Sequence, residues 1–306
     1  MIKKTLQYKI TEKDQGKTVE QFLRSKGYSH RLVVKLRNSP TGLTIGGELA
    51  FTIHRLQAGE ILIATLEEEN SQNIVPVELP LNIVYEDEDI LVVNKDAGVP
   101  IHPSQGHFDH TLANAVAWYY QSKGQTLVYR AINRLDRDTT GLLVIAKHLL
   151  AGCILSDQML NRQIHRQYRA IVCGKTEKEG IIDAPIGRAE DSTVLRRIDF
   201  EHGETARTRY RLLSYDEEKD LSYISLKLDT GRTHQIRVHM KYIGHPLYGD
   251  FLYNPNYRYL NRQSLHSWKL SFPHPITGIH LHFTAPLPAD MKQFLPSLPH
   301  TAPFCI

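Results

Sequence analysis

The sequence predicts an α+β protein in which a small N-terminal module precedes a larger domain, and three observations point to this fold. From residue 81 onward, apolar runs of strand length follow one another with few helical patterns between them. Two short helical patterns and short strands occupy the first part of the chain. An acidic, polar segment from Glu67 to Asn73, followed by Pro76 and Pro80, is read as a linker. The expected division is a module of residues 1–70, a linker of residues 71–80 and a domain of residues 81–306.

Local signals define the elements of the module. Thr18 and Gln21 match a capping box at the start of one helix, and Ser29 can cap a second helix. Gly27, between the two helices, suits the left-handed position just after a helix end. Short strands are expected at residues 43–45 and 61–64.

The clearest element of the larger domain is the continuous apolar run from Leu142 to Ala146, which predicts a buried strand. Leu149, Cys153, Leu160 and Ile164 recur behind it at helical spacing, so a helix is expected to follow. The further elements expected are strands at residues 83–85, 90–93, 168–172 and 224–228, and helices at residues 111–120 and 233–242.

The net charge of +4 permits nucleic-acid binding, and the distribution of charge favours it. Acidic residues gather around residues 67–69 and 86–89, whereas basic residues gather elsewhere. The basic groups are Arg188, Arg196, Arg197, Arg207, Arg209 and Arg211, and Arg162, His165, Arg166 and Arg169. This segregation predicts a cationic face, with a solvated surface as the alternative.

The sequence favours neither a disulfide framework nor a metal site. Cys153, Cys173 and Cys305 are odd in number and widely spaced. His234 and His239 lie five residues apart and so miss the spacing that places two ligands on one helix face. Neither a signal-peptide core nor a run of membrane-spanning length is present. We therefore expect a reduced, cytoplasmic protein without membrane association.

A charged turn just before the buried strand contains a candidate nucleophile. Asp136 stands between Arg134 and Arg137, and Arg130 lies a few residues earlier. These guanidinium groups are expected to keep Asp136 ionised and to attract a polyanion. A loop braced by a buried strand can hold a reactive side chain in fixed geometry. The pattern favours a carboxylate acting on a nucleic acid, and the alternative is a turn aspartate that bonds to nearby amides.

Three segments together resemble the signature of the RluA-like family of RNA pseudouridine synthases. They are NRLDRDTTG (133–141), HRQYRAIV (165–172) and LDTGRTHQIRVHMKYIGHPLYGD (228–250). The family pattern is an HRLD loop ending in TG or SG, then K/R-x-Y-x-A, then TGR-x-HQ-I/L-R-x-H. NKDAGVPIHP, APIGR and HGETARTRY look like further landmarks in the expected order, so the resemblance covers about residues 80–290.

The resemblance implies a mixed, mainly antiparallel sheet with flanking helices, and isomerisation of uridine in RNA without a metal or an organic cofactor. Asp136 matches the family aspartate that attacks the ribose, or assists a glycal route, while the uracil detaches, rotates and rejoins through carbon. Tyr168 matches the tyrosine that stacks beside the base and serves as the proton-removing base. Arg237 matches the arginine that pairs with the aspartate. The expected catalytic set is Asp136, Tyr168 and Arg237.

RNA binding is assigned to a wider set of cationic side chains. Arg134 matches the family arginine that helps to fill the space left by the flipped base. The expected RNA-binding residues are Arg134, Arg137, Arg232, His234, Arg196, Arg197 and Arg207. Two positions depart from the family pattern: Asn133 stands where histidine is usual, and Thr140 where serine is usual.

The N-terminal module resembles an S-four-like RNA-binding domain, with an unrelated α+β appendage as the alternative. Such a module favours ribosomal RNA over transfer RNA as the substrate, and we expect a monomer without an obligate protein partner. Two other functions remain open from the sequence: a non-catalytic RNA-binding or assembly protein, and a glycosidase using Asp136 with Asp138. Two carboxylates two residues apart in a loop are unsuited to the spacing that a glycosidase needs.

Overall fold

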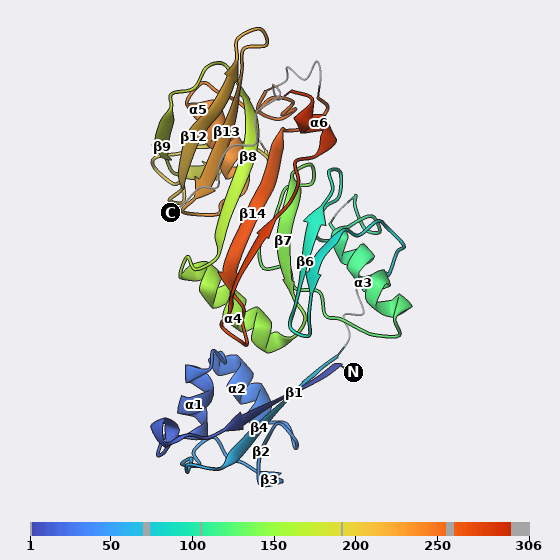
Figure 1. Cartoon of the computed structure of the whole chain (residues 1–306), viewed down its shortest axis with the longest axis vertical. Helices are drawn as coiled ribbons and strands as arrows, with labels where there is room; N and C mark the ends of the chain where they lie inside the picture. The colour runs from blue at the N-terminus through green and yellow to red at the C-terminus, as the bar shows by residue number, and fades with distance from the viewer. Residues whose placement is uncertain (1, 70–73, 105, 191, 255–259, 295–306) are drawn as a thin grey trace.

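The computed structural model describes residues 2–69, 74–104, 106–190, 192–254 and 260–294 (Figure 1). Two separate main sheets are present in these residues, one before and one after residue 70. Cys153 and Cys173 are free thiols, and Cys305 lies outside the described residues. No helix in the described ranges is both long and apolar enough to cross a membrane.

The N-terminal module is an antiparallel four-stranded sheet, in the order β1-β4-β2-β3, with two helices packed on it. The predicted capping box of Thr18 and Gln21 and the Ser29 cap are confirmed, and Gly27 has a φ of 88° directly after the first helix. The elements are β1 (Ile2–Lys9), α1 (Val19–Ser25), α2 (His30–Arg37), β2 (Leu43–Ile45), β3 (Glu48–Leu49) and β4 (Ile61–Glu68), with a 3-10 turn at Glu12–Asp14.

The expectation of a linker from Glu67 to Asn73 is wrong at its start, because Glu67 and Glu68 end β4. Glu68 is drawn into the interior, where its carboxylate accepts hydrogen bonds from the Leu149 amide at 2.8 Å and from Arg130. Residues 70–73 lie outside the described residues. The sequence also failed to predict β1, because in that strand only Leu6 is buried and the apolar alternation is weak.

The larger domain is built on a nine-stranded sheet in the order β5-β6-β7-β14-β8-β13-β12-β9, with β15 paired to β14. Only β7 and β14 run parallel and the other pairs are antiparallel, so the predicted α+β class with a mixed, mainly antiparallel sheet is confirmed. Its strands are β5 (Ile83–Glu86), β6 (Ile90–Lys95), β7 (Thr140–Ala146), β8 (His165–Cys173), β9 (Glu179–Asp183), β12 (Arg207–Asp216), β13 (Leu221–Leu228), β14 (Leu265–Pro273) and β15 (His280–Thr284), and β10 (Ile186–Arg188) pairs separately with β11 (Arg196–Ile198).

Helices cover both faces of this sheet. On one face, Leu143 and Ile145 of β7 pack in a core with residues of α3 (Leu112–Ser122) and α5 (Gln235–Tyr242). On the other face, Leu142 and Val144 pack against α4 (Leu149–Leu160). Every residue of β7 is buried, as its continuous apolar run predicts. A short helix, α6 (Ala289–Lys292), is the last element described.

Two helices are shorter than the sequence predicts. The helix expected at residues 233–242 begins at Gln235, because the Gln235 side-chain oxygen accepts hydrogen bonds from the Arg232 amide and the Thr230 hydroxyl and so holds the preceding residues in a loop. His234 is left-handed in this loop, with a φ of 57°. The helix behind β7 ends at Leu160, because Arg162 is also left-handed, and Ile164 packs in the core from the loop that follows.

The module contacts the larger domain through α4, which lies between the two sheets in Figure 1. Leu149, Leu150, Cys153 and Ile154 pack against the core of the module. The fit is close at Gly27, where an added Cβ would lie 2.5 Å from Cγ1 of Ile154. Only a glycine therefore combines the left-handed backbone with this contact.

Candidate active site

Asp136 lies in the loop that leads into β7, and two buried basic side chains hold the backbone of this loop. The Thr139 amide donates to the Asp136 carbonyl at 3.1 Å and closes the turn. Lys95 donates to the carbonyls of Asp96, Val99 and Arg137, the last at 2.7 Å. Arg262 donates to the carbonyl of Asp138 at 3.2 Å. Burial lowers the pKa of Lys95 to about 7, although the carboxylates of Asp138 and Asp136 act in the opposite direction.

Arg237 connects Asp136 to a second, deeply buried carboxylate. Its Nη1 donates to Oδ2 of Asp136 at 3.0 Å, while Nε and Nη2 donate to Asp250 at 2.7 and 2.8 Å. Arg237 is 2% exposed and Asp250 is fully buried. Burial alone would lower the pKa of Arg237, but the hydrogen bond to Asp250 and the two carboxylate charges raise it overall. The guanidinium therefore stays charged and fixes the rotamer of Asp136.

These groups line a recess of about 500 Å³, a volume that includes the space open to solvent. Its walls come from the Asp136 loop, from β8 and β13, and from the start of α5. Tyr168 projects from β8 into this lining and is otherwise buried. The lining residues that the sequence also predicted as site residues are Arg134, Asp136, Tyr168, Arg232, His234 and Arg237.

The structure does not place the remaining predicted RNA-binding residues in the recess. Arg137 turns to Asp138, at 3.0 Å, and Arg197 pairs with Glu190 at 2.6 Å. Arg207 lies 3.6 and 3.7 Å from Asp183 and Asp229. Arg196 donates from its side chain to nearby carbonyls.

The expectation that Arg130, Arg134 and Arg137 crowd Asp136 needs a correction. Arg130 turns to Glu68 and Arg137 to Asp138, whereas the cation in contact with Asp136 is Arg237, 101 positions further along the chain. Proximity in the sequence did not predict the cation that contacts Asp136, because the guanidiniums of Arg130 and Arg137 each lie closer to another carboxylate.

Several residues of the site were not predicted. Asp250 is the final residue of the third motif, so its position in that motif was the available signal. Arg166 lines the recess two residues before Tyr168, on the same face of β8. The apolar part of the lining includes Leu228 and Leu265, which continue the core beneath the sheet.

The two residues that depart from the family pattern, Asn133 and Thr140, support the Asp136 loop from outside the recess. Asn133 is buried and its side-chain oxygen accepts a hydrogen bond from the Val144 amide of β7 at 3.1 Å. The Thr140 hydroxyl lies 2.9 Å from Nδ1 of His266, whose pKa burial lowers to about 4. Neither Asn133 nor Thr140 lines the recess, so both act on the position of the loop.

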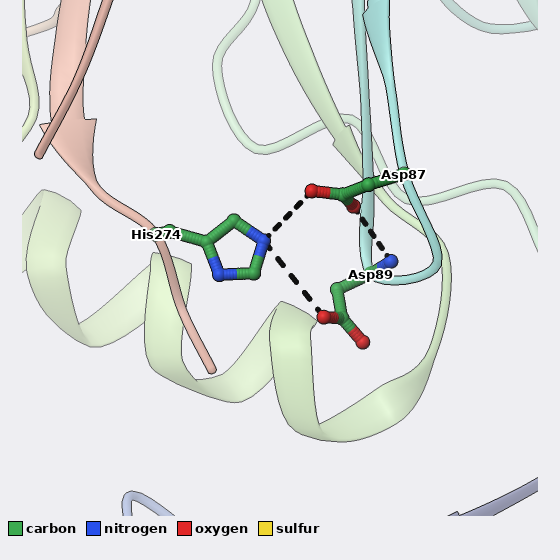
Figure 2. A group of neighbouring side chains, drawn as sticks. All are labelled: Asp87, Asp89 and His274. Atoms are coloured by element: carbon green, nitrogen blue, oxygen red, sulfur yellow. Dashed lines mark hydrogen bonds and ion pairs between the residues drawn. The ribbon is translucent and has the colours of Figure 1, made fainter. Parts of the chain in front are cut away.

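One group of side chains has the residue types of a metal site, but its acceptors are already engaged. Ligand atoms of Asp87, Asp89 and His274 lie within 4.8 Å of one another (Figure 2). His274 contacts both carboxylates, and Asp89 also pairs with Lys4 and His148, each at 2.9 Å. Asp87 accepts further hydrogen bonds from the Asp89 and Ile90 amides and from Tyr85. The group is thus an ion-pair junction that joins β1 to the larger domain.

Comparison with known protein families gives a match for residues 89–242, to the family described as RNA pseudouridylate synthase. This range contains the Asp136 loop, Tyr168 and Arg237.

Relatives and a solved structure agree with this match. A Bacillus subtilis protein named uncharacterized RNA pseudouridine synthase YjbO is 40% identical over 280 residues, covering 91% of this chain and 98% of the relative. The ribosomal large subunit pseudouridine synthase D of Vibrio cholerae is 39% identical over 253 residues, covering 78% of this chain and 77% of the relative. The structure of human RNA pseudouridylate synthase domain containing 1 is 28% identical and has a TM-score of 0.58, covering 68% of this chain and 83% of that one.

Proposed function

Because the chain belongs to the family of RNA pseudouridine synthases and is thus an RNA-modifying isomerase, we propose that Asp136 is its catalytic carboxylate. The observation that carries this proposal is the contact between Asp136 and Arg237 at the recess that Tyr168 also lines. A carboxylate that is held by a buried guanidinium, yet reaches a pocket, can meet a developing positive charge with a fixed negative one.

The proposed reaction conserves every atom of the nucleoside. Asp136 attacks C1′ of the ribose, or removes the proton from C2′ in the glycal route, as the bond from C1′ to N1 of uracil breaks. The detached uracil rotates, and C5 forms the new bond to C1′ as the bond from C1′ to Asp136 breaks or, in the glycal route, as Asp136 returns the proton to C2′. The proton on C5 then leaves, with Tyr168 as the proposed acceptor, and N1 gains a proton. Since Oδ2 of Asp136 accepts from Arg237, Oδ1 is the oxygen available to the substrate.

The target uridine has to leave its stack to enter the recess, which costs a few kcal/mol. Arg134 is exposed at the recess and is proposed to enter the space that the base vacates. Within the described chain, neither Arg134 nor Arg166 has a carboxylate partner, in contrast to Arg232, which pairs with Glu204. We propose that Arg166 binds a phosphate that flanks the flipped nucleotide, and phosphate binding is the alternative role for Arg134.

We propose ribosomal RNA as the substrate, in preference to transfer RNA. Two kinds of support exist: the similarity to the enzyme named ribosomal large subunit pseudouridine synthase D, and a separate N-terminal module. The module, residues 1–70, is proposed to bind RNA as an S-four-like domain, with residues 81–306 as the catalytic domain. We further propose that the protein acts in the cytoplasm as a monomer.

Substitution of Asp136 tests the catalytic assignment. Asp136→Asn is expected to lower pseudouridine formation by at least about a thousandfold while RNA affinity stays nearly unchanged. Asp138→Asn is the matched control, because it removes a loop carboxylate that pairs with Arg137 and does not line the recess. Turnover of Asp136→Asn at the level of the control would refute the assignment.

Mapping of pseudouridine in total RNA, with and without the gene, tests the substrate. Loss of a modified position in ribosomal RNA is the expected result, and loss confined to transfer RNA would overturn that choice. An unchanged RNA mass separates isomerisation from a glycosidase reaction, which would release free uracil. The glycosidase hypothesis also lacks a second carboxylate among the recess residues.

A further inference from the structure

Tyr253 lies behind the active site, and its hydroxyl connects two polar groups. The oxygen accepts a hydrogen bond from the Arg196 amide at 2.9 Å and lies 2.9 Å from Nδ1 of His234. Tyr253 is 6% exposed, and burial raises the pKa of its hydroxyl, which therefore keeps its proton. Among the described residues, Nδ1 of His234 is the one acceptor beside this buried hydroxyl, so the hydroxyl proton is directed to it.

This hydrogen bond determines where the proton of His234 resides. A ring nitrogen that accepts a hydrogen bond carries no proton, so a neutral His234 has its proton on Nε2. Nε2 faces Oδ2 of Asp136 at 3.8 Å, and the same oxygen accepts from Arg237 at 3.0 Å. His234 is held in this orientation by a left-handed backbone, which residues other than glycine rarely adopt.

The charges around His234 come from four residues on separate segments. Burial lowers the pKa of His234, and Arg237 and Arg196 act in the same direction, whereas Asp136 and Asp250 act in the opposite one. The ring is therefore neutral near pH 7, and its tautomer matters. Tyr253 also contacts the other partner of Asp136, since its ring lies 5.0 Å from Cζ of Arg237.

We propose that Tyr253 is a positioning residue: its hydroxyl holds His234 in the tautomer with the proton on Nε2. His234 and Arg237 then both present N–H groups to Oδ2 of Asp136, which leaves Oδ1 to the substrate. The inference rests on the proposed role of Asp136. It adds a residue outside the recess lining that acts on Asp136 through His234.

Tyr253→Phe tests the proposal, because it removes the hydroxyl and keeps the buried ring. Side-chain ¹⁵N spectra of His234 should show the Nε2-protonated tautomer in the unmodified protein and a loss of that preference in the variant. The kcat for pseudouridine formation should fall about 3- to 10-fold, as expected for the loss of one neutral hydrogen bond, with KM for RNA little changed. Tyr129→Phe is the control, since that buried hydroxyl has no hydrogen-bond partner among the described residues.

A double-mutant cycle separates positioning from a general effect on packing. If Tyr253 acts through His234, then Tyr253→Phe should lower kcat no further in a His234→Phe background. Additive losses, an unchanged His234 tautomer or an unchanged kcat in Tyr253→Phe would each overturn the proposal. The tautomer is measured without turnover, so an active Asp136→Asn variant would refute the role of Asp136 and leave the Tyr253–His234 result readable.

Discussion

Asp250 binds one edge of the Arg237 guanidinium, and Asp136 binds a different edge of the same guanidinium. Asp250 uses both carboxylate oxygens, at 2.7 and 2.8 Å, and its Oδ1 also accepts from the Leu252 amide at 3.1 Å. The fully buried carboxylate thus fixes the arginine that in turn fixes Asp136. A displacement of the Asp250 carboxylate would displace Arg237 and therefore Asp136.

Loss of the Asp250 charge should therefore affect stability and activity together. Asp250→Asn leaves the charge of Arg237 without its buried partner, so the free energy of unfolding should fall by about 3 kcal/mol. Urea unfolding measures this loss, and kcat should fall with it. Asp290→Asn is the control, because Asp290 pairs with Arg262 nearer the surface and should cost less. Equal losses in the two variants would argue against the role given to Asp250.

Replacement of Arg237 by lysine tests the geometry of the pair rather than its charge. A lysine keeps the positive charge but cannot bond to Asp250 at two atoms and to Asp136 at a third. The loss of one charge-assisted hydrogen bond predicts a fall in kcat of roughly 10- to 100-fold in Arg237→Lys. Steady-state kinetics on a defined RNA measure this, and a kcat within twofold of the unmodified enzyme would contradict it.

The salt dependence of RNA binding should identify the arginines that contact phosphate. Arg166→Ala should reduce the slope of log K against log salt by about 0.7 to 0.9, whereas Arg134→Ala should leave it nearly unchanged if Arg134 enters the vacated stack. Arg197→Ala is the matched control, since Arg197 already pairs with Glu190 and Asp199. Fluorescence anisotropy at several salt concentrations gives the slopes. If Arg197→Ala has the larger effect, the RNA follows the basic region of residues 188–211 instead.

Acid should destabilise the ion-pair junction of Asp87, Asp89 and His274. Burial acts to raise the pKa of Asp89, but His148 and Lys4 lower it to about 2 overall. A carboxyl whose pKa is lower in the folded state contributes stability above its unfolded pKa of about 4, and this contribution is lost as the pH falls toward 2. The contribution is about 2 kcal/mol. Asp89→Asn should remove it, so that unfolding free energies measured from pH 6 to pH 2 fall less steeply.

The sequence predicted the elements whose signals are local. The apolar run of β7, the capping box at Thr18 and the Ser29 cap are set by neighbouring residues, and each is present in the structure. The polar strand β12 was missed because only Thr208 in it is buried and most of its positions are partly exposed, so the alternation that marks a strand is weak.

The site itself depends on contacts between distant segments. Asp136, Tyr168 and Arg237 were brought together in the sequence by the family resemblance, since no spacing rule predicts a contact across 101 positions. Asp250 and Tyr253 were missed because they act on Arg237 and His234 from a segment whose approach depends on the tertiary fold. The ion pairs of the basic region, such as Arg209 with Asp229 and Arg197 with Glu190, could not be predicted from the sequence, because these contacts form only on folding.

The seven residues of β7 separate the Asp136 loop from α4, on which the module rests. At about 3.3 Å per residue, the strand is about 23 Å long. An RNA that contacts the recess and the module at once has to extend beyond this length. Oligonucleotides of only a few nucleotides are too short to contact the recess and the module together, so the module should not contribute to their modification. The length of the shortest RNA that is modified efficiently then measures the distance between the recess and the module.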